Sequence, residues 1–150
     1  MTNPIYPFAA DVGQRIAKDA LIYNLINPRI GGVLLAGEKG TAKSTLIRSI
    51  SELTDDQEII ELPLNVTEDM LIGTIDIESA IKDGKKNLSP GILKKAHHNV
   101  LYVDEVNLLS DSIINSLLDV SASGINKIER EGISYSHQAH FSLIGSMNPE

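Results

Sequence analysis

The residues most able to do chemistry lie in a glycine-rich segment, residues 37–44, which follows a short apolar run. In such a turn, successive backbone N–H groups hold phosphate oxygens, and the positive end of the following helix assists them. Lys43 is placed to reach the β- and γ-phosphates, and Ser44 can offer its hydroxyl to Mg²⁺. We therefore predict a phosphate-binding loop formed by Gly37, Glu38, Lys39, Gly40, Thr41, Ala42, Lys43, Ser44 and Thr45.

One residue departs from the usual pattern of such loops, because Ala42 stands where a glycine usually precedes the lysine. Alanine costs little there if its φ is negative, and it strains the loop if φ is positive. The alternative interpretation is a tight strand-to-helix turn that binds nothing. Lys43 argues against it, since a lysine in the first helical turn opposes the helix dipole unless an anion is present.

Two carboxylates, Asp104 and Glu105, follow the apolar run 100–103, in the form of a Walker B element. Ligands of open α/β sheets bind at the carboxyl ends of the strands. There, Asp104 would hold the hydration shell of Mg²⁺, and Glu105 would orient or deprotonate the attacking water. Such a pattern is common by chance, but its pairing with the phosphate loop makes it specific.

Asn148 follows the next apolar run, residues 141–147, and is expected beside the same site. A neutral amide can position a γ-phosphate and a water molecule without adding negative charge. The alternative is a turn-forming asparagine before Pro149.

The four histidines are predicted to be structural or surface residues. His97 and His98 are adjacent and expected to face different ways, and His137 and His140 lack acidic or cysteine companions at ligand spacing.

The elements that must position these residues alternate between helical and apolar, strand-like patterns, which indicates a parallel sheet in an α/β layer fold. Residues 1–150 are predicted to form one domain. Three helices are expected. The first is 11–27, with apolar or small residues at helical spacing: Ile16, Ala20, Leu21, Tyr23 and Leu25. The second is 43–53, with one apolar face: Leu46, Ile47, Ile50 and Leu53. The third is 110–120, which Ser110 caps and whose apolar stripe is Ile113, Ile114, Leu117 and Leu118. The expected strands are 31–36, 58–64, 100–103 and 141–147.

Two further segments are expected to differ from this alternation. Within 67–99, residues 71–77 could form a strand or hairpin arm, and Ser89-Pro90 is expected to start a helix through His98. Residues 124–140 are expected to form a hairpin that turns near Glu131-Gly132.

Composition excludes several classes of protein. The net charge of −7 and the 4% aromatic content disfavour a nucleic-acid-binding surface. The absence of cysteine excludes disulfides, thiolate zinc sites and cysteine nucleophiles. No apolar window is long enough to span a bilayer, and the first ten residues do not have the order of a signal peptide, so a soluble, cytoplasmic protein is expected.

With these elements placed, the chain resembles the AAA+ ATPases, and more narrowly the ATPase I subunit of magnesium chelatase. The generic elements are the phosphate loop and Asp104-Glu105, and the flanking blocks are more specific. These blocks include Tyr6-Pro7-Phe8, Val12-Gly13-Gln14, Pro28-Arg29-Ile30-Gly31-Gly32-Val33, Thr67-Glu68-Asp69, Gly73-Thr74-Ile75-Asp76-Ile77-Glu78, Pro90-Gly91-Ile92-Leu93, residues 101–109, Leu117-Leu118-Asp119-Val120, Glu129-Arg130-Glu131-Gly132-Ile133-Ser134 and Ser146-Met147-Asn148-Pro149-Glu150.

The resemblance implies an AAA+ three-layer sandwich with a central parallel sheet. It implies that residues 67–90 are an insertion in the second helix and residues 124–140 a pre-sensor hairpin, both facing neighbouring subunits or the opening of a ring. Val12 and Gly13 would lie near the adenine. The implied activity is hydrolysis of ATP, with Mg²⁺, that drives Mg²⁺ insertion into a protoporphyrin together with two other subunit types. Cobalt chelatases share the same kind of ATPase, so the inserted metal stays open.

The family continues beyond the sensor-1 motif at Asn148 with an arginine-bearing segment and a helical lid. We therefore expect a truncated core that binds ATP but hydrolyses it slowly, since an arginine finger contributes about 10³–10⁵ in turnover.

Three alternatives stay open from the sequence. A MoxR-like remodelling ATPase would share the three site elements but not the chelatase-like blocks. A non-hydrolysing interaction subunit is opposed by the presence of Lys43, Ser44, Asp104, Glu105 and Asn148, and only Ala42 favours it. A nucleic-acid-dependent ATPase is weakened by the negative net charge.

Overall fold

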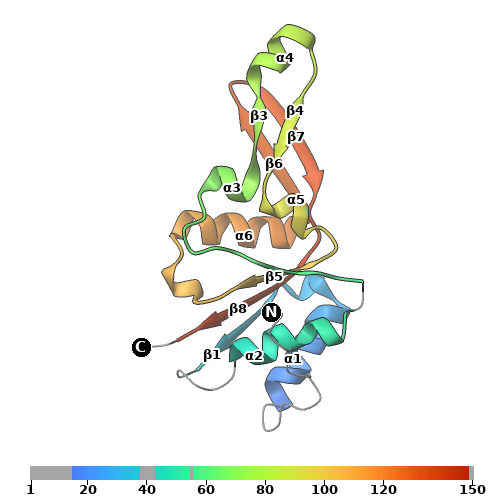
Figure 1. Ribbon diagram of the computed structural model, residues 1–150, viewed down its shortest axis with the longest axis vertical. Helices are drawn as coiled ribbons and strands as arrows, with labels where there is room; N and C mark the ends of the chain where they lie inside the picture. The colour runs from blue at the N-terminus through green and yellow to red at the C-terminus, as the bar shows by residue number, and fades with distance from the viewer. Residues whose placement is uncertain (1–14, 38–42, 55, 149–150) are drawn as a thin grey trace, which may run out of the picture.

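A four-stranded parallel sheet organises the chain in the computed structural model, which describes residues 15–37, 43–54 and 56–148 (Figure 1). The strand order is β1 (Val33–Ala36), β8 (Ser142–Met147), β5 (Val100–Val103) and β2 (Ile59–Glu61). The four predicted strands and their parallel arrangement are therefore confirmed, although β1 and β2 are shorter than expected.

Helices cover both faces of this sheet, and β5 shows why they do. All four residues of β5 are fully buried. Val100 and Tyr102 pack with residues of α1 (Arg15–Ile26), α2 (Lys43–Arg48) and the 3₁₀-helix η3 (Ser49–Glu52). Leu101 and Val103 pack on the opposite face with α3 (Glu68–Ile72), α5 (Ile92–Ala96) and α6 (Asp111–Ser123). Because side chains alternate along a strand, a run that is apolar at every position is buried on both sides.

The expected apolar face of α1 is only partly correct. Leu21 is fully buried, but Ile16 and Tyr23 are 87% and 62% exposed. Asn24 takes the buried position instead, and its Nδ2 donates to the carbonyl of Leu143 in β8 over 3.3 Å. A polar residue that bonds to the sheet thus fixes which stripe of the helix faces inward. Residues 11–14 of the expected helix lie outside the described residues.

The helices beside the sheet confirm most of the predicted packing. In α6, Ser110 caps the first turn by accepting from the N–H of Ile113, as predicted, and the helix continues to Ser123 before Gly124 ends it. In the expected helix 43–53, α2 gives way to η3 at Ser49, whose hydroxyl donates to the carbonyl of Leu46. Leu53 is consequently half-exposed, contrary to its expected place on the buried face.

Two antiparallel pairs project together from the α6 side of the sheet (Figure 1). The first consists of β3 (Gly73–Asp76) and β4 (Asn87–Pro90), connected through α4 (Ile77–Asp83). The second is the predicted hairpin, β6 (Ile125–Arg130) and β7 (Ile133–Gln138). The buried Asn126 donates to the carbonyl of Ile72 over 2.9 Å, and Lys86 donates to the carbonyl of Ser134 over 2.9 Å. These bonds join the two pairs into one projection.

The expectation of a strand or hairpin arm within residues 71–77 is confirmed for residues 73–76, because β3 pairs antiparallel with β4. Residues 71 and 72 instead end α3, which Thr67 caps and Gly73, at φ 99°, terminates. The expected start of the next helix was wrong. Ser89-Pro90 lies in β4 rather than at a helix start, and α5 begins only after Gly91. A Cβ at Gly91 would meet the backbone of Leu71 and Gly73, so the close approach of these segments requires glycine.

Among the described residues, no helix is both long and apolar enough to cross a membrane.

Candidate functional site

The carboxyl ends of three parallel strands bring the predicted site residues to one edge of the sheet. Ala36 of β1 pairs with Met147 of β8, and the N–H of Gly37 donates to the carbonyl of Met147 over 3.2 Å. On the other side of β8, Val103 pairs with Gly145. Gly37, Asp104 and Asn148 therefore follow neighbouring strand ends, where the sequence analysis expected the residues of a shared site.

Asp104 is anchored across the sheet by a residue that sequence reasoning missed. The hydroxyl of Ser146, in β8, donates to Asp104 Oδ1 over 2.7 Å. Ser146 is 2% exposed, whereas Asp104 itself is exposed. One carboxylate oxygen is thus held from the buried side while the carboxylate stays open to a ligand. A parallel register between β5 and β8, assumed from the sequence, would have placed Ser146 opposite Asp104.

Glu105 adopts a left-handed backbone conformation, with φ 54° and ψ 61°. This conformation costs a residue other than glycine about 1–2 kcal/mol. Its N–H donates to Ser146 Oγ over 3.3 Å, and its carbonyl accepts from the N–H of Leu108 over 2.9 Å. The strand therefore turns sharply at the second carboxylate, and hydrogen bonds on both sides hold the turn.

Asn148 presents a polar atom with no protein partner. Its Oδ1 is buried and makes no hydrogen bond to any residue that the structure describes. Buried polar atoms without a partner are uncommon, and each suggests a ligand, a water molecule or an ion. At this strand end the atom is suited to a polar ligand, so the residues present fit the predicted nucleotide and its Mg²⁺.

An ion pair lies on the α2 side of the same edge. Arg48, at the end of α2, donates from Nε to Glu61 Oε1 over 2.9 Å, and Glu61 is the last residue of β2. The hydrogen bond that Arg48 donates to Glu61 raises the pKa of Arg48, and the negative charges of Glu61 and Asp104 raise it further against the effect of burial. The guanidinium consequently stays charged within the electrostatic reach of Asp104. Sequence reasoning did not single out this pair.

The remaining predicted residues divide into two groups. Lys43 and Ser44 form the start of α2, directly after the loop, and Thr45 is exposed. The predictions for Glu38, Lys39, Gly40, Thr41 and Ala42, and for Val12 and Gly13, fall outside the described residues.

Three of the four histidines meet at the amino ends of β5 and β8, at the edge of the sheet opposite the candidate site. The ring centroids of His97 and His98 are 3.8 Å apart, and those of His97 and His140 are 5.7 Å apart. The expectation that His97 and His98 face different ways was wrong, because φ at His98 is 63° and the chain reverses there. Among the described residues, no cluster of at least three histidine, aspartate or glutamate side chains is arranged to hold a metal ion.

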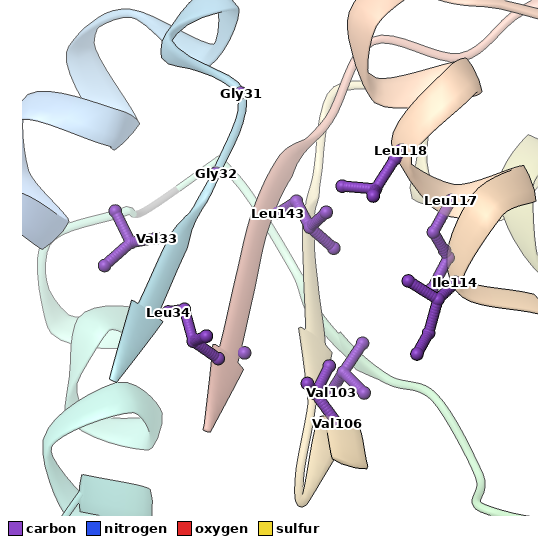
Figure 2. Close-up of a pocket in the computed structure, with 11 residues that line it drawn as sticks. Gly31, Gly32, Val33, Leu34, Val103, Val106, Ile114, Leu117, Leu118 and Leu143 are labelled. Carbon is purple, nitrogen blue, oxygen red and sulfur yellow. The ribbon is translucent and has the colours of Figure 1, made fainter. Parts of the chain in front are cut away.

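An apolar groove of about 280 Å³ lies between β1 and α6 (Figure 2). Leu34 and Leu118 line opposite sides, and each is about half exposed. Among the described residues that line it, none carries an ionisable side chain. The residues that line it are Gly31, Gly32, Val33, Leu34, Val103, Val106, Ile114, Leu117, Leu118, Leu143 and Gly145.

A parallel sheet covered on both faces, with Gly37 after β1 and a carboxylate after β5 on either side of β8, is the arrangement of an α/β domain of the AAA+ P-loop class. Comparison with known proteins agrees: residues 32–150 match the family described as AAA domain (dynein-related subfamily), and the chain belongs to this family.

The relatives of the chain include magnesium-chelatase subunits. It is 48% identical over 182 residues to the magnesium-chelatase subunit ChlI homolog of Methanocaldococcus jannaschii, which covers 97% of this chain and 50% of the relative. It is 46% identical over 187 residues to the chloroplastic magnesium-chelatase subunit ChlI of Nicotiana tabacum, covering 99% of this chain and 44% of the relative. The chain thus spans about half the length of the curated relatives it matches.

A solved structure shows the same fold. A chain in the complex of the magnesium chelatase subunits BchI and BchD, from a single-particle cryo-EM reconstruction, aligns with a TM-score of 0.85 and 39% identity. The alignment covers 99% of this chain and 56% of that chain. The resemblance inferred from the sequence, to AAA+ ATPases and to the ATPase I subunit of magnesium chelatase, is therefore confirmed.

Proposed function

We propose that this chain binds Mg·ATP at the carboxyl edge of its sheet and hydrolyses it as the motor subunit of a metal chelatase, driving insertion of Mg²⁺ into a protoporphyrin. The observation that carries the proposal is the convergence of Gly37, Asp104 and Asn148 on neighbouring strand ends. The similarity to magnesium-chelatase subunits supports the same conclusion.

Each residue has a role that its chemistry suits. Lys43 and the backbone of residues 37–42 would hold the phosphates, while Ser44 and Asp104 would hold the Mg²⁺. The bound Mg²⁺ would neutralise charge on the β- and γ-phosphates. Glu105 would accept a proton from the attacking water or orient it.

Asn148 would complete the site at the γ-phosphate. Its Oδ1 is the buried acceptor without a partner, so it can accept a hydrogen bond from the attacking water. The amide adds no negative charge beside the phosphates. A difference between the ATP-bound and product-bound states would therefore be sensed at the end of β8.

The complete protein is proposed to form a homo-oligomeric ring and to act with other chelatase subunits, and residues 1–150 are proposed to be one AAA+ core. The joined projection of β3–α4–β4 and β6–β7 gives this core a surface that stands away from the sheet (Figure 1). Ring contacts through this projection follow from the resemblance stated above. Insertion of cobalt instead of magnesium, by the same ATPase mechanism, stays the alternative for the inserted metal.

Calorimetric titration with Mg·ATP tests the proposal directly. The parent protein is expected to bind, and Lys43→Ala is expected to abolish binding because the phosphates lose their cation. Lys94→Ala, an exposed lysine on α5 at the other face of the sheet, is the matched control and should bind like the parent. Failure of the folded parent to bind would contradict the proposal and favour a non-hydrolysing interaction subunit.

The nearest alternative within the class is a MoxR-like remodelling ATPase, which would bind Mg·ATP equally well. Stimulation of metal insertion into a porphyrin by the protein together with its partner subunits would separate the two functions. Stimulation that disappears with Lys43→Ala supports the chelatase, and its absence in an active ATPase supports remodelling.

A further inference from the structure

We propose that Ser146 is a positioning residue for the bound Mg²⁺, acting through the carboxylate of Asp104 and the backbone N–H of Glu105 at once. This inference rests on the proposed function. It assigns a role to a residue whose hydroxyl lies between Asp104 and Glu105 rather than at the nucleotide itself.

The hydrogen-bonding capacity of one hydroxyl explains the arrangement. A serine hydroxyl donates one hydrogen and accepts through two lone pairs. The hydroxyl of Ser146 donates its hydrogen to Asp104 Oδ1 over 2.7 Å and accepts from the N–H of Glu105 over 3.3 Å. The phenol oxygen of Tyr102 lies 3.4 Å from the same hydroxyl, and since the serine hydrogen is already used, Tyr102 is the donor there.

The direction of these bonds orients Asp104. An ionised carboxylate can only accept, so a donor on one oxygen leaves the other oxygen and the remaining lone pairs for the metal shell. At 2.7 Å the bond has the usual length of a hydrogen bond from a hydroxyl to an oxygen. Groups that orient a metal-binding carboxylate in this way tune the affinity of the site.

The second bond concerns the turn at Glu105. Its left-handed conformation is costly for glutamate and persists only where the surroundings enforce it. Ser146 accepts from the N–H at this turn, so the hydroxyl that orients Asp104 also holds the backbone that carries Glu105. One residue of β8 therefore couples the metal carboxylate to the proposed general base.

A purely structural role for Ser146 is the competing interpretation, and the chain supplies a control for it. Ser142 lies four residues earlier on β8, on the same face, and is 1% exposed. Its hydroxyl has no hydrogen-bond partner. Replacing Ser142 by alanine thus removes a buried hydroxyl from the same strand without breaking a bond to Asp104 or Glu105.

The test measures Mg²⁺ dependence rather than turnover alone. The variants Ser146→Ala, Ser146→Thr, Ser142→Ala and Tyr102→Phe are titrated calorimetrically with a non-hydrolysable ATP analogue, in EDTA and then over a series of Mg²⁺ concentrations. Ser146→Ala is expected to raise the Mg²⁺ concentration for half-saturation by about 10-fold or more, as for other outer-shell partners of a metal. Binding in EDTA should stay as in the parent.

The other variants decide between the interpretations. Ser146→Thr keeps the hydroxyl and should restore the Mg²⁺ dependence, Ser142→Ala should resemble the parent, and Tyr102→Phe should shift the dependence in the same direction as Ser146→Ala by a smaller factor. A general packing defect would instead weaken binding equally with and without Mg²⁺, which would overturn the inference.

The result also separates this inference from the proposed function. Mg²⁺-dependent binding by the parent together with an unchanged Ser146→Ala would overturn the positioning role and leave the nucleotide site intact. An absence of binding by the parent would overturn both. If Ser146→Ala does not fold, the comparison of Tyr102→Phe with Ser142→Ala gives the decision.

Discussion

The hydroxyl of Ser146 donates to the carboxylate of Asp104 over 2.7 Å, although the two residues are 42 positions apart in the chain. Parallel pairing of β8 with β5 produces this contact, since Val103 is paired with Gly145 and the next residues of the two strands continue side by side. Strand register therefore sets the geometry of the proposed metal carboxylate as directly as the local sequence does.

We expect Glu105→Gln to bind Mg·ATP like the parent but to reduce ATP turnover by about 10²–10⁴, the usual contribution of general acid–base catalysis. Glutamine has a similar size and can keep the turn, but it cannot accept the proton. The matched control is Glu131→Gln, because Glu131 is also a glutamate at positive φ, in the exposed β6–β7 turn. Equal turnover in Glu105→Gln and the parent would remove Glu105 from the mechanism.

We expect Asn148→Ala to retain nucleotide binding and to lower turnover roughly 100-fold, as loss of one preorganised polar group at a reacting centre does. The reason is the buried Oδ1, which has no protein partner and is therefore available to a ligand. Single-turnover hydrolysis measures the effect, with the exposed Asn107→Ala as control. If Asn148 is only a turn residue, its replacement will change thermal stability and leave the hydrolysis rate unaffected.

The sequence predicted best the elements whose pattern of apolar residues is compatible with only one kind of secondary structure and burial. β5 agrees to the residue, since an apolar run bounded by Asn99 and Asp104 can only be buried on both faces. The β6–β7 hairpin turned where Glu131-Gly132 predicted, and Ser110 capped α6. The convergence of Gly37, Asp104 and Asn148 followed from the expectation that ligands bind at the carboxyl ends of parallel strands.

The elements that were missed depend on contacts between distant segments. The helices α3 and α4 have five and seven residues, too few for periodicity to distinguish helix from strand. Their caps, Thr67 and Asp76, were the available signals. Ser146 was missed because its role depends on register with Asp104, and the histidine cluster because it depends on the positive φ at His98.

We expect Gly124→Ala to destabilise the protein more than Gly84→Ala. Both glycines have a left-handed backbone conformation, with φ 70° at Gly124 and 64° at Gly84, so each substitution costs about 1–2 kcal/mol in backbone energy. A Cβ at Gly84 meets nothing, whereas a Cβ at Gly124 meets the imidazole of His140, which would have to leave its place beside His97. Overpacking adds about 1–3 kcal/mol. Urea unfolding of both variants measures the difference, and equal losses would show that the ring moves freely.

The stability of the protein should fall when the pH decreases below about 6.5, the ordinary pKa of histidine. Burial lowers the pKa of His97, and the charges of the neighbouring histidines lower it further. Its Nδ1 also accepts from the N–H of His140 over 3.1 Å, which requires an unprotonated nitrogen. With the folded pKa below the unfolded one, the unfolded chain binds more protons, so this contribution is complete above the unfolded pKa and is lost as the pH falls through the folded pKa.

Urea unfolding at pH values from 8 down to 5 measures this dependence. His97→Gln is expected to be less stable at pH 8, because the histidine packing is lost, and to show a shallower decline toward pH 5. His98→Gln is expected to make the decline shallower by a smaller amount, because it removes one of the charges that lower the pKa of His97 and leaves the bond from His140 to His97 Nδ1 in place. An identical decline in His97→Gln and the parent would assign the pH dependence to groups other than His97.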